Sequence, residues 1–385
     1  MAHESLRNGA GHLSDTTLLR TPLNEAHRRL GARMVDFAGW DMPVQYPSGI
    51  IAEHLAVRSG CGIFDLSHMG RVFVRGADAL ALAQRCCTRD LSRIRPGEAA
   101  YSVVCQPDGG IVDDVIAYVL GPEEVLFVFN ASNREKDVAW FAEQRSAASL
   151  DAFLDDQTRE TALIGIQGPQ AQSVLQSLCT NDLGPLPGYA FTRADVAAKQ
   201  ALVSRTGYTG EDGFEVMCSG EDAEHVWTAL LDIKSVTAAG LGARDTLRTE
   251  AGMALYGHEI DQHTNPYEAR LGWVVSLKKP DFVGRDTLVQ VKERGPERTL
   301  VGLEVDPGGV PRPEFPILHD GEPVGALTSG THSPTLKRSI GIGYVPIALA
   351  VPGQALAIEM RGKPVAAHVV SLPFVPHHSR PRAKM

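Results

Sequence analysis

Two adjacent aspartates, Asp113 and Asp114, are the residues of this sequence with the clearest potential for chemistry. They stand in the stretch DGGIVDDVIAYVL (108–120), which is otherwise apolar and rich in Val and Ile, so the pattern predicts a buried or half-buried strand. Neighbouring strand residues face opposite ways, and both faces of this strand are apolar. A buried carboxylate needs a partner, a raised pKa or a ligand. Each aspartate is therefore either functional or paired structurally with an arginine or with loop N–H groups.

A glycine-rich segment, RTGYTGEDGFE (205–215), precedes another predicted strand. Glycines permit positive φ and a close approach of the backbone. One interpretation is a loop that lays its backbone and Glu215 against a flat heterocycle; the other is an ordinary glycine-rich turn. A phosphate-binding loop is excluded, because neither GxxxxGK[ST] nor a GxGxxG after a strand is present.

Several single residues are further candidates. Arg244 and Arg248 lie four positions apart on a predicted helix, where they form either a surface ladder with acidic neighbours or a grip on a ligand carboxylate. Asn130 ends the hairpin that leaves the strand of Asp113, so it lies near that aspartate or caps a helix. His68 is a lone histidine in an apolar context, which favours a structural role. No histidine spacing predicts a metal site.

Composition limits the class of protein. The 385 residues are 43% apolar and 22% charged, as in an ordinary globular protein of two or three domains. A net charge of −9 argues against nucleic-acid binding. The six cysteines form no CxxC and indicate reduced intracellular thiols, and no apolar run reaches the ~20 residues of a membrane helix. Residues 1–20 resemble no signal peptide, so we expect a disordered tail and a cytoplasmic location.

The elements that must position these residues indicate an α+β protein. Residues 115–120 and 125–129 predict a β-hairpin with a four-residue loop, and 37–46 predicts an ordered loop. Beyond residue 285, short strands and turns are typical of a small antiparallel β-barrel. Helices are predicted at 23–30, 51–58, 77–87, 130–145, 168–178, 221–233 and 244–253, and further strands at 71–75, 101–105, 161–166 and 201–204.

Nine segments in order, over residues 20 to 376, closely resemble the aminomethyltransferase (T-protein) family of the glycine cleavage system. They are FAGWDMPVQY (37–46), FDLSHMG (64–70), GGIVDDVI (109–116), NASNREKD (130–137), IQGPQA (166–171), RTGYTGEDGFE (205–215), GLGARDTLR (240–248), TNPYEARLGWVV (264–275) and SGTHSPTLKRSIGIGYV (329–345).

The resemblance implies a three-domain, cloverleaf-like fold around tetrahydrofolate. It implies a discontinuous folate-binding domain, an inserted α+β domain that carries the Asp113 strand, and a C-terminal barrel domain. The expected bounds are 21–50 with 140–280, 51–139, and 285–376, followed by a tail at 377–385.

The resemblance also implies a reaction and a set of site residues. The methylene of an aminomethyl group on the dihydrolipoyl arm of H-protein passes to tetrahydrofolate, which gives ammonia and 5,10-methylenetetrahydrofolate. Asp113 matches the catalytic carboxylate, and Asp114 is then structural. Glu215 accepts the adjacent N–H groups of a pterin, Tyr101 and Tyr208 supply flat walls, and Arg244 and Asn130 match ligand-binding positions. Tetrahydrofolate is the co-substrate, lipoylated H-protein the partner, and no metal is expected.

Two alternatives stay open on the sequence. A sister enzyme of the same fold would demethylate another N- or S-methyl donor onto tetrahydrofolate, and a non-catalytic folate-binding protein would keep only the pocket. The chain also departs from the family after LPFVP (372–376): His377 and His378 stand where the family often carries a ligand-contacting tyrosine.

Overall fold

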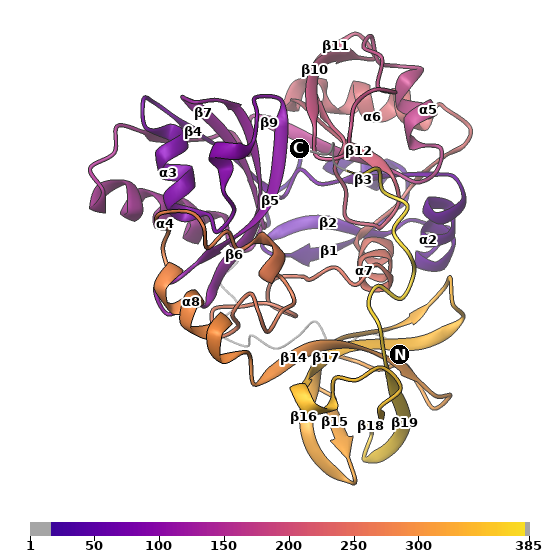
Figure 1. Cartoon of the computed structure of the whole chain (residues 1–385). Helices are drawn as coiled ribbons and strands as arrows, with labels where there is room; N and C mark the ends of the chain where they lie inside the picture. The colour runs from indigo at the N-terminus through magenta and orange to yellow at the C-terminus, as the bar shows by residue number, and fades with distance from the viewer. Residues whose placement is uncertain (1–16, 382–385) are drawn as a thin grey trace.

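The computed structural model describes residues 17–381 and shows three lobes, two of them open sheets and one a barrel (Figure 1). Residues 1–16 of the predicted tail 1–20, and residues 382–385 of the predicted tail 377–385, lie outside the described residues. Leu19 also belongs to the predicted disordered tail, but it is ordered. Its N–H donates to Gly39 O (2.9 Å) and its carbonyl accepts from Asp41 N (2.8 Å).

The first lobe is a six-stranded sheet with helices on both faces. Ile63 and Ile164 pack on one face with Trp227, whereas Phe64 and Leu163 pack on the other, as the alternation of strand residues requires. All neighbours are antiparallel except β3 and β13. The strands, in spatial order, are β10 (Phe191–Val196), β11 (Lys199–Ser204), β12 (Gly213–Ser219), β9 (Thr161–Gln167), β3 (Cys61–Asp65) and β13 (Val236–Ala238); the helices are α1 (Asn24–Arg29), α2 (Ile50–Ser59), α5 (Ala171–Gln176), η2 (Gly220–Asp222), α6 (Ala223–Leu231) and α7 (Leu241–Glu250).

The second lobe is a five-stranded sheet covered by two helices, whose core includes Leu82 of α3 and Phe141 of α4. The predicted hairpin is confirmed, with a loop of two residues between Gly121 and Glu124 in place of four. In spatial order the strands are β5 (Glu98–Cys105), β6 (Ile111–Gly121), β7 (Glu124–Phe129), β4 (Gly70–Arg75) and β8 (Phe153–Asp156); the helices are α3 (Ala79–Cys86), η1 (Leu91–Arg93) and α4 (Arg134–Ala147).

Strand pairing favours other bounds for the inserted domain than the predicted 51–139. β3 lies within that range but pairs with β9 and β13 of the first sheet, and β8 lies beyond it but pairs with β4 of the second. Because a sheet is a single hydrogen-bonded unit, we propose that the inserted domain runs from β4 to β8, residues 70–156.

The third lobe is a closed antiparallel barrel, as predicted, and the α+β class is confirmed. Its interior holds aliphatic residues such as Val301, Leu303 and Ile358. The barrel strands are β14 (Arg298–Val305), β15 (Pro316–His319), β16 (Glu322–Ser333), β17 (Arg338–Pro346), β18 (Ala355–Met360) and β19 (Lys363–Val370); η3 (Gly272–Val274) and α8 (Arg285–Arg294) precede them and η4 (Ile347–Leu349) lies among them.

The prediction of a loop over 37–46 is wrong in part, because β1 (Arg33–Phe37) and β2 (Trp40–Gln45) form a hairpin. Ala38 (φ 52°) and Gly39 (φ 78°) make the two-residue turn with positive φ that matches strand twist. Pro43 misled the prediction. A two-stranded ribbon has only edges, so a proline that cannot donate to a ladder is tolerated there.

A shared core joins the two sheets and α7. Phe64 and Leu163 of the first sheet, Tyr118 and Leu126 of the second, and Leu247 of α7 belong to one buried cluster. This cluster fixes the strand that carries Asp113 and Asp114 relative to the strand that carries Glu215.

Candidate functional site

The position of the two aspartates follows from the register of β6. Ile116 pairs with Val128 of β7, so continuing the antiparallel register sets Asp114 opposite Asn130, the first residue after β7. On the other edge Val104 and Val103 of β5 pair with Asp113 and Asp114. Both carboxylates therefore lie beyond the end of β7. There the residues of the following turn, and no longer the paired strand, supply their hydrogen-bond donors.

Asp113 is fully buried, with an exposed fraction of 0%. It accepts hydrogen bonds from Asn130 N (3.1 Å), Asn130 Nδ2 (2.8 Å) and Asn133 Nδ2 (2.6 Å). Three N–H donors from the turn after β7 thus hold this carboxylate in place.

Asp114 faces the other way and is partly exposed. Tyr101 Oη donates to its Oδ2 (3.1 Å), and Asn130 Nδ2 donates to its Oδ1 (2.8 Å). Burial, followed by repulsion from ionised Asp113, raises the pKa of Asp114 to about 7. A carboxyl group poised near neutral pH and open to one side is typical of a reacting group.

Tyr208 lies close enough to Asp114 to interact with it electrostatically, and Arg244 packs on Tyr208. The Arg244 guanidinium stacks over the Tyr208 ring at 4.6 Å, and Asp114 acts electrostatically on both Tyr208 and Tyr101. Burial lowers the pKa of Arg244, and within residues 17–381 the only hydrogen bond of its side chain is a long one to Met69 Sδ (3.9 Å). Without a carboxylate partner among these residues, this guanidinium is available to an anionic or carbonyl group of a ligand.

Glu215 projects from β12, where it pairs with Ser204 of β11 and Gly165 of β9. Thr206 Oγ1 (2.6 Å) and Tyr118 Oη (3.3 Å) both donate to its Oε2. This leaves Oε1 for a donor from outside the chain. Arg244 lies close enough for Glu215 to act on it electrostatically, which connects the pair Asp114–Tyr208 with Glu215.

Two glycines of the glycine-rich loop, Gly207 and Gly213, are required by packing against Gln167. A Cβ on Gly207 would lie 2.1 Å from Gln167 Oε1, and one on Gly213 would lie 2.6 Å from Gln167 Cδ. The Gln167 amide passes under the loop and donates to Thr206 O (3.1 Å) and Phe214 O (3.3 Å). The loop is thus rigidly held, and it presents Tyr208 from one side.

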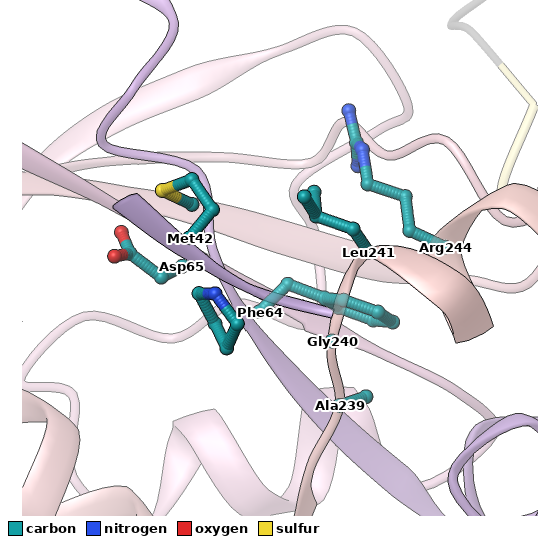
Figure 2. A pocket seen from close by; sticks show the side chains of 8 residues that line it. Met42, Phe64, Asp65, Ala239, Gly240, Leu241 and Arg244 are labelled. Carbon is teal, nitrogen blue, oxygen red and sulfur yellow. The ribbon is translucent and has the colours of Figure 1, made fainter. Parts of the chain in front are cut away.

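The surface-ladder interpretation of Arg248 is wrong, because only 1% of this residue is exposed. It binds Glu259 (2.7 Å) and Ser329 of the barrel (2.7 Å). Figure 2 shows a small pocket beside the start of α7, in which the Asp65 carboxylate and the Arg244 guanidinium point to different sides. The pocket has no room for a water molecule.

His68 is buried against Phe37 in an edge-to-face contact at 5.5 Å. Burial lowers its pKa to about 3, so the ring is neutral at physiological pH. Among the described residues its Nδ1 has no hydrogen-bond partner. The predicted structural role is consistent with this burial, although the ring is not fully satisfied.

The C-terminal segment that differs from the family, His377 and His378, lies against the glycine-rich loop. His378 N donates to Gly210 O (2.7 Å), and His378 Nδ1 lies 3.1 Å from the Glu211 carboxylate. His377 Nε2 bonds Ala251 O (2.8 Å) at the end of α7. Residues 377 and 378 therefore support the loop of Tyr208.

All six predicted site residues are connected by these contacts: Asp113, Tyr101, Asn130, Tyr208, Glu215 and Arg244. The sequence analysis missed Trp273, which stacks on Tyr101 (5.8 Å) with 62% of its surface exposed, and the partners Asn133, Tyr118 and Asp137. The spacing NASNREKD contained a signal for Asn133 and Asp137, since both lie on the first turn after Asn130.

Within residues 17–381 no group of three or more His, Cys, Asp or Glu side chains could hold a metal ion. No helix of that range is long and apolar enough to span a membrane.

Comparisons with known proteins identify the family of this chain. Residues 23–279 match the GCVT N-terminal domain, and residues 298–376 match the glycine cleavage T-protein C-terminal barrel domain. The chain is 51% identical to an aminomethyltransferase of Rubrobacter xylanophilus over 93% of this chain and 94% of the relative, and 44% identical to one of Bacillus subtilis over 93% and 99%. The crystal structure of glycine cleavage system aminomethyltransferase T from Bartonella henselae superposes with a TM-score of 0.89 at 33% identity, covering 94% of this chain and 99% of that one. This chain belongs to the aminomethyltransferase family, the T-proteins of the glycine cleavage system.

Proposed function

We propose that this chain transfers the methylene of an aminomethyl group, carried on the dihydrolipoyl arm of H-protein, to tetrahydrofolate. The products are ammonia, reduced lipoyl protein and 5,10-methylenetetrahydrofolate. One observation carries the proposal: a partly exposed carboxylate, two tyrosines, an arginine without a carboxylate partner and a second carboxylate, Glu215, converge from four elements (β5, β6, β12 and α7) and the glycine-rich loop.

The residues fit a reduced folate. A pterin offers adjacent N–H groups, which the Glu215 carboxylate accepts through its free oxygen Oε1 while Thr206 and Tyr118 hold Oε2. Tyr101 and Tyr208 provide flat apolar surfaces for the rings. Arg244 supplies a positive group for the carbonyl or anionic edge. The folate nitrogens supply the nucleophile that accepts the methylene.

The carboxylate that meets the substrate is, in this proposal, Asp114 and not the predicted Asp113. Asp113 has no exposed surface, and its carboxylate oxygens already accept hydrogen bonds from Asn130 and Asn133. Asp114 is partly exposed, lies beside Tyr101 and Tyr208, and has a pKa raised to about 7. It orients the reacting nitrogens and stabilises the positive charge that develops as ammonia leaves.

The test is an assay of ammonia release and 5,10-methylenetetrahydrofolate formation from aminomethylated H-protein, with Asp113→Asn and Asp114→Asn as a matched pair. We expect wild-type turnover and a loss of about 100-fold or more in kcat for Asp114→Asn with folate binding retained. Asp113→Asn removes a charge of the same size from the neighbouring residue. A larger loss in Asp113→Asn than in Asp114→Asn would return the catalytic role to Asp113.

Two other outcomes would replace the proposal. Tetrahydrofolate binding without turnover of aminomethylated H-protein, together with turnover of a small N- or S-methyl donor, would make the protein a sister demethylase. Folate binding without turnover of any donor would make it a folate-binding protein. Glu215→Ala serves as the control for the ligand itself, because it should weaken tetrahydrofolate binding and leave the fold intact.

A further inference from the structure

Asp137, on the first turn of α4, is a buried carboxyl group to which the proposed reaction assigns no role. Only 1% of the residue is exposed, and neither side-chain oxygen has a hydrogen-bond partner as a carboxylate. An ionised, unpartnered carboxylate in such a place is strongly unfavourable. The fold must therefore compensate this group in another way.

The neighbour of Asp137 is Asp113, with which it makes a side-chain contact within hydrogen-bonding reach. Two carboxylates offer no donor to one another, so the contact is favourable only if the pair shares one proton. Asp113 receives three N–H donors, which need an acceptor, whereas Asp137 receives none. The proton therefore resides on Asp137, in agreement with a pKa of Asp137 raised far above its usual range by burial and then by Asp113.

We infer that Asp137 is a permanently protonated acid that donates a hydrogen bond to Asp113 and so positions the reacting carboxylate Asp114. The link between the two is Asn130. Its amide nitrogen donates both to Asp113 Oδ1 (2.8 Å) and to Asp114 Oδ1 (2.8 Å), so one amide sets the two carboxylates relative to each other. Asp137 is thus a positioning residue that never touches the substrate.

The surroundings of Asp137 support this assignment. Lys136, the adjacent residue, does not pair with it: its Nζ donates to Val112 O (2.6 Å) and Tyr256 Oη (3.0 Å). Lys136 attracts Asp137 electrostatically, but burial and the neighbouring Asp113 oppose ionisation of Asp137 more strongly. The amide of Asn133 binds Asp113 (2.6 Å), and Asp137 accepts no hydrogen bond from a described residue.

A first test reads the proton directly and rests on no assumption about the reaction. The infrared carbonyl stretch of a protonated carboxylic acid should persist in the wild-type protein at pH 9 and disappear in Asp137→Asn. At that pH Asp114, with a pKa of about 7, is ionised and does not contribute. A wild-type protein whose difference spectrum against Asp137→Asn lacks this band would overturn the inference.

A second test reads the positioning role, and it rests on the proposed function. Asp137→Leu has no donor for Asp113 and should lower kcat by about 10- to 100-fold, while Asp137→Asn, whose amide can still donate, should stay within about threefold of the wild type. Because the effect passes through Asn130 to Asp114, KM for tetrahydrofolate should change less than kcat. Equal kcat values for folded Asp137→Leu and wild type would contradict the role.

The control is Glu135→Leu, a neighbouring charge removal on the same helix whose side chain is 91% exposed. It should leave kcat and the infrared band unchanged. If the wild type itself turns over no aminomethylated H-protein, the proposed function fails, while the infrared band still decides whether Asp137 carries the proton. Circular dichroism confirms that each variant is folded.

Discussion

Two buried regions of this protein treat carboxylates in opposite ways. At the junction between the first lobe and the barrel, Glu250 of α7 is fully buried and receives Arg58 Nη2 (2.9 Å), Thr335 N (3.1 Å) and the Ser333 hydroxyl. At the site, Asp113, Asp114 and Asp137 crowd together with amide and hydroxyl donors, and none of the three forms a salt bridge with a described residue.

The pKa values follow this difference. Burial raises the pKa of Glu250, but hydrogen bonds from His54, Ser333 and Thr335 outweigh it and hold the value at about 2. Burial also raises the pKa of Asp114, and repulsion from Asp113 adds to it, so the value reaches about 7. The ionised carboxylate of Glu250 thus stabilises the fold, whereas ionisation of Asp114 destabilises it.

The network around Glu250 is connected to the site through α7 and through Arg58. Glu250 lies on the same helix as Arg244, six residues apart, and Arg58 also binds Glu211 (2.9 Å) of the glycine-rich loop. The junction therefore anchors the helix of Arg244 and the loop of Tyr208. Strained groups at the site can persist because a well-satisfied network beside them supplies rigidity.

The largest expected effect on stability comes from removing the junction carboxylate. Glu250→Ala leaves Arg58 and His54 partly unpaired in a buried place and should lower the free energy of unfolding by about 3–5 kcal/mol. Urea unfolding measures the loss. The control Glu224→Ala breaks an exposed ion pair with Arg29 and should change stability by less than about 1 kcal/mol. Equal losses in the two variants would break the comparison.

Removal of the site carboxylate should have the opposite sign. Asp114→Asn abolishes an ionisation that the fold opposes, so we expect the free energy of unfolding at pH 8 to rise by about 1–3 kcal/mol while turnover falls. Thermal unfolding and the H-protein assay on the same preparation measure both changes. A variant that loses both stability and activity would show that Asp114 is held as favourably as Glu250.

The two regions should also separate by pH. Glu250 has a folded-state pKa below the ordinary 4.5, so its contribution is present above pH 4.5 and is lost as the pH falls toward 2. Asp114 has a raised pKa, so stability is fully present below about pH 4 and declines as the pH rises to 7. We expect a plot of unfolding free energy against pH, from pH 3 to 9, to change in each variant. Glu250→Gln should remove the fall in stability at acid pH, and Asp114→Asn should remove the fall between about pH 4 and 7.

The sequence predicted the strand of Asp113 and Asp114, the hairpin and the barrel, and it named six candidate site residues that hydrogen bonds, ring contacts or electrostatic interactions connect. The choice of Asp113 as the catalytic carboxylate came from the resemblance and stays a prediction, because alternation along a strand says only that the two aspartates face opposite ways. The different exposure of the two aspartates depends on β7 ending opposite Asp114, where the turn at Asn130 and Asn133 covers Asp113. Likewise the burial of Arg248 depends on Ser329 from the barrel, 81 residues away, which no local pattern contains.

The smallest effect is expected where the C-terminal segment meets the glycine-rich loop. The His378–Glu211 contact joins a side chain that is 61% exposed to one that is 3% exposed, so His378→Ala should lower stability by less than about 1 kcal/mol. Glu211 keeps Arg58 as its partner in that variant. Because His378 N still donates to Gly210 O, Tyr208 should stay in place and KM for tetrahydrofolate should change less than about twofold. Isothermal titration with tetrahydrofolate and thermal unfolding measure these changes. A large rise in KM would mean that the histidine side chain, and not the backbone, holds the loop, and the junction network would then extend to the ligand.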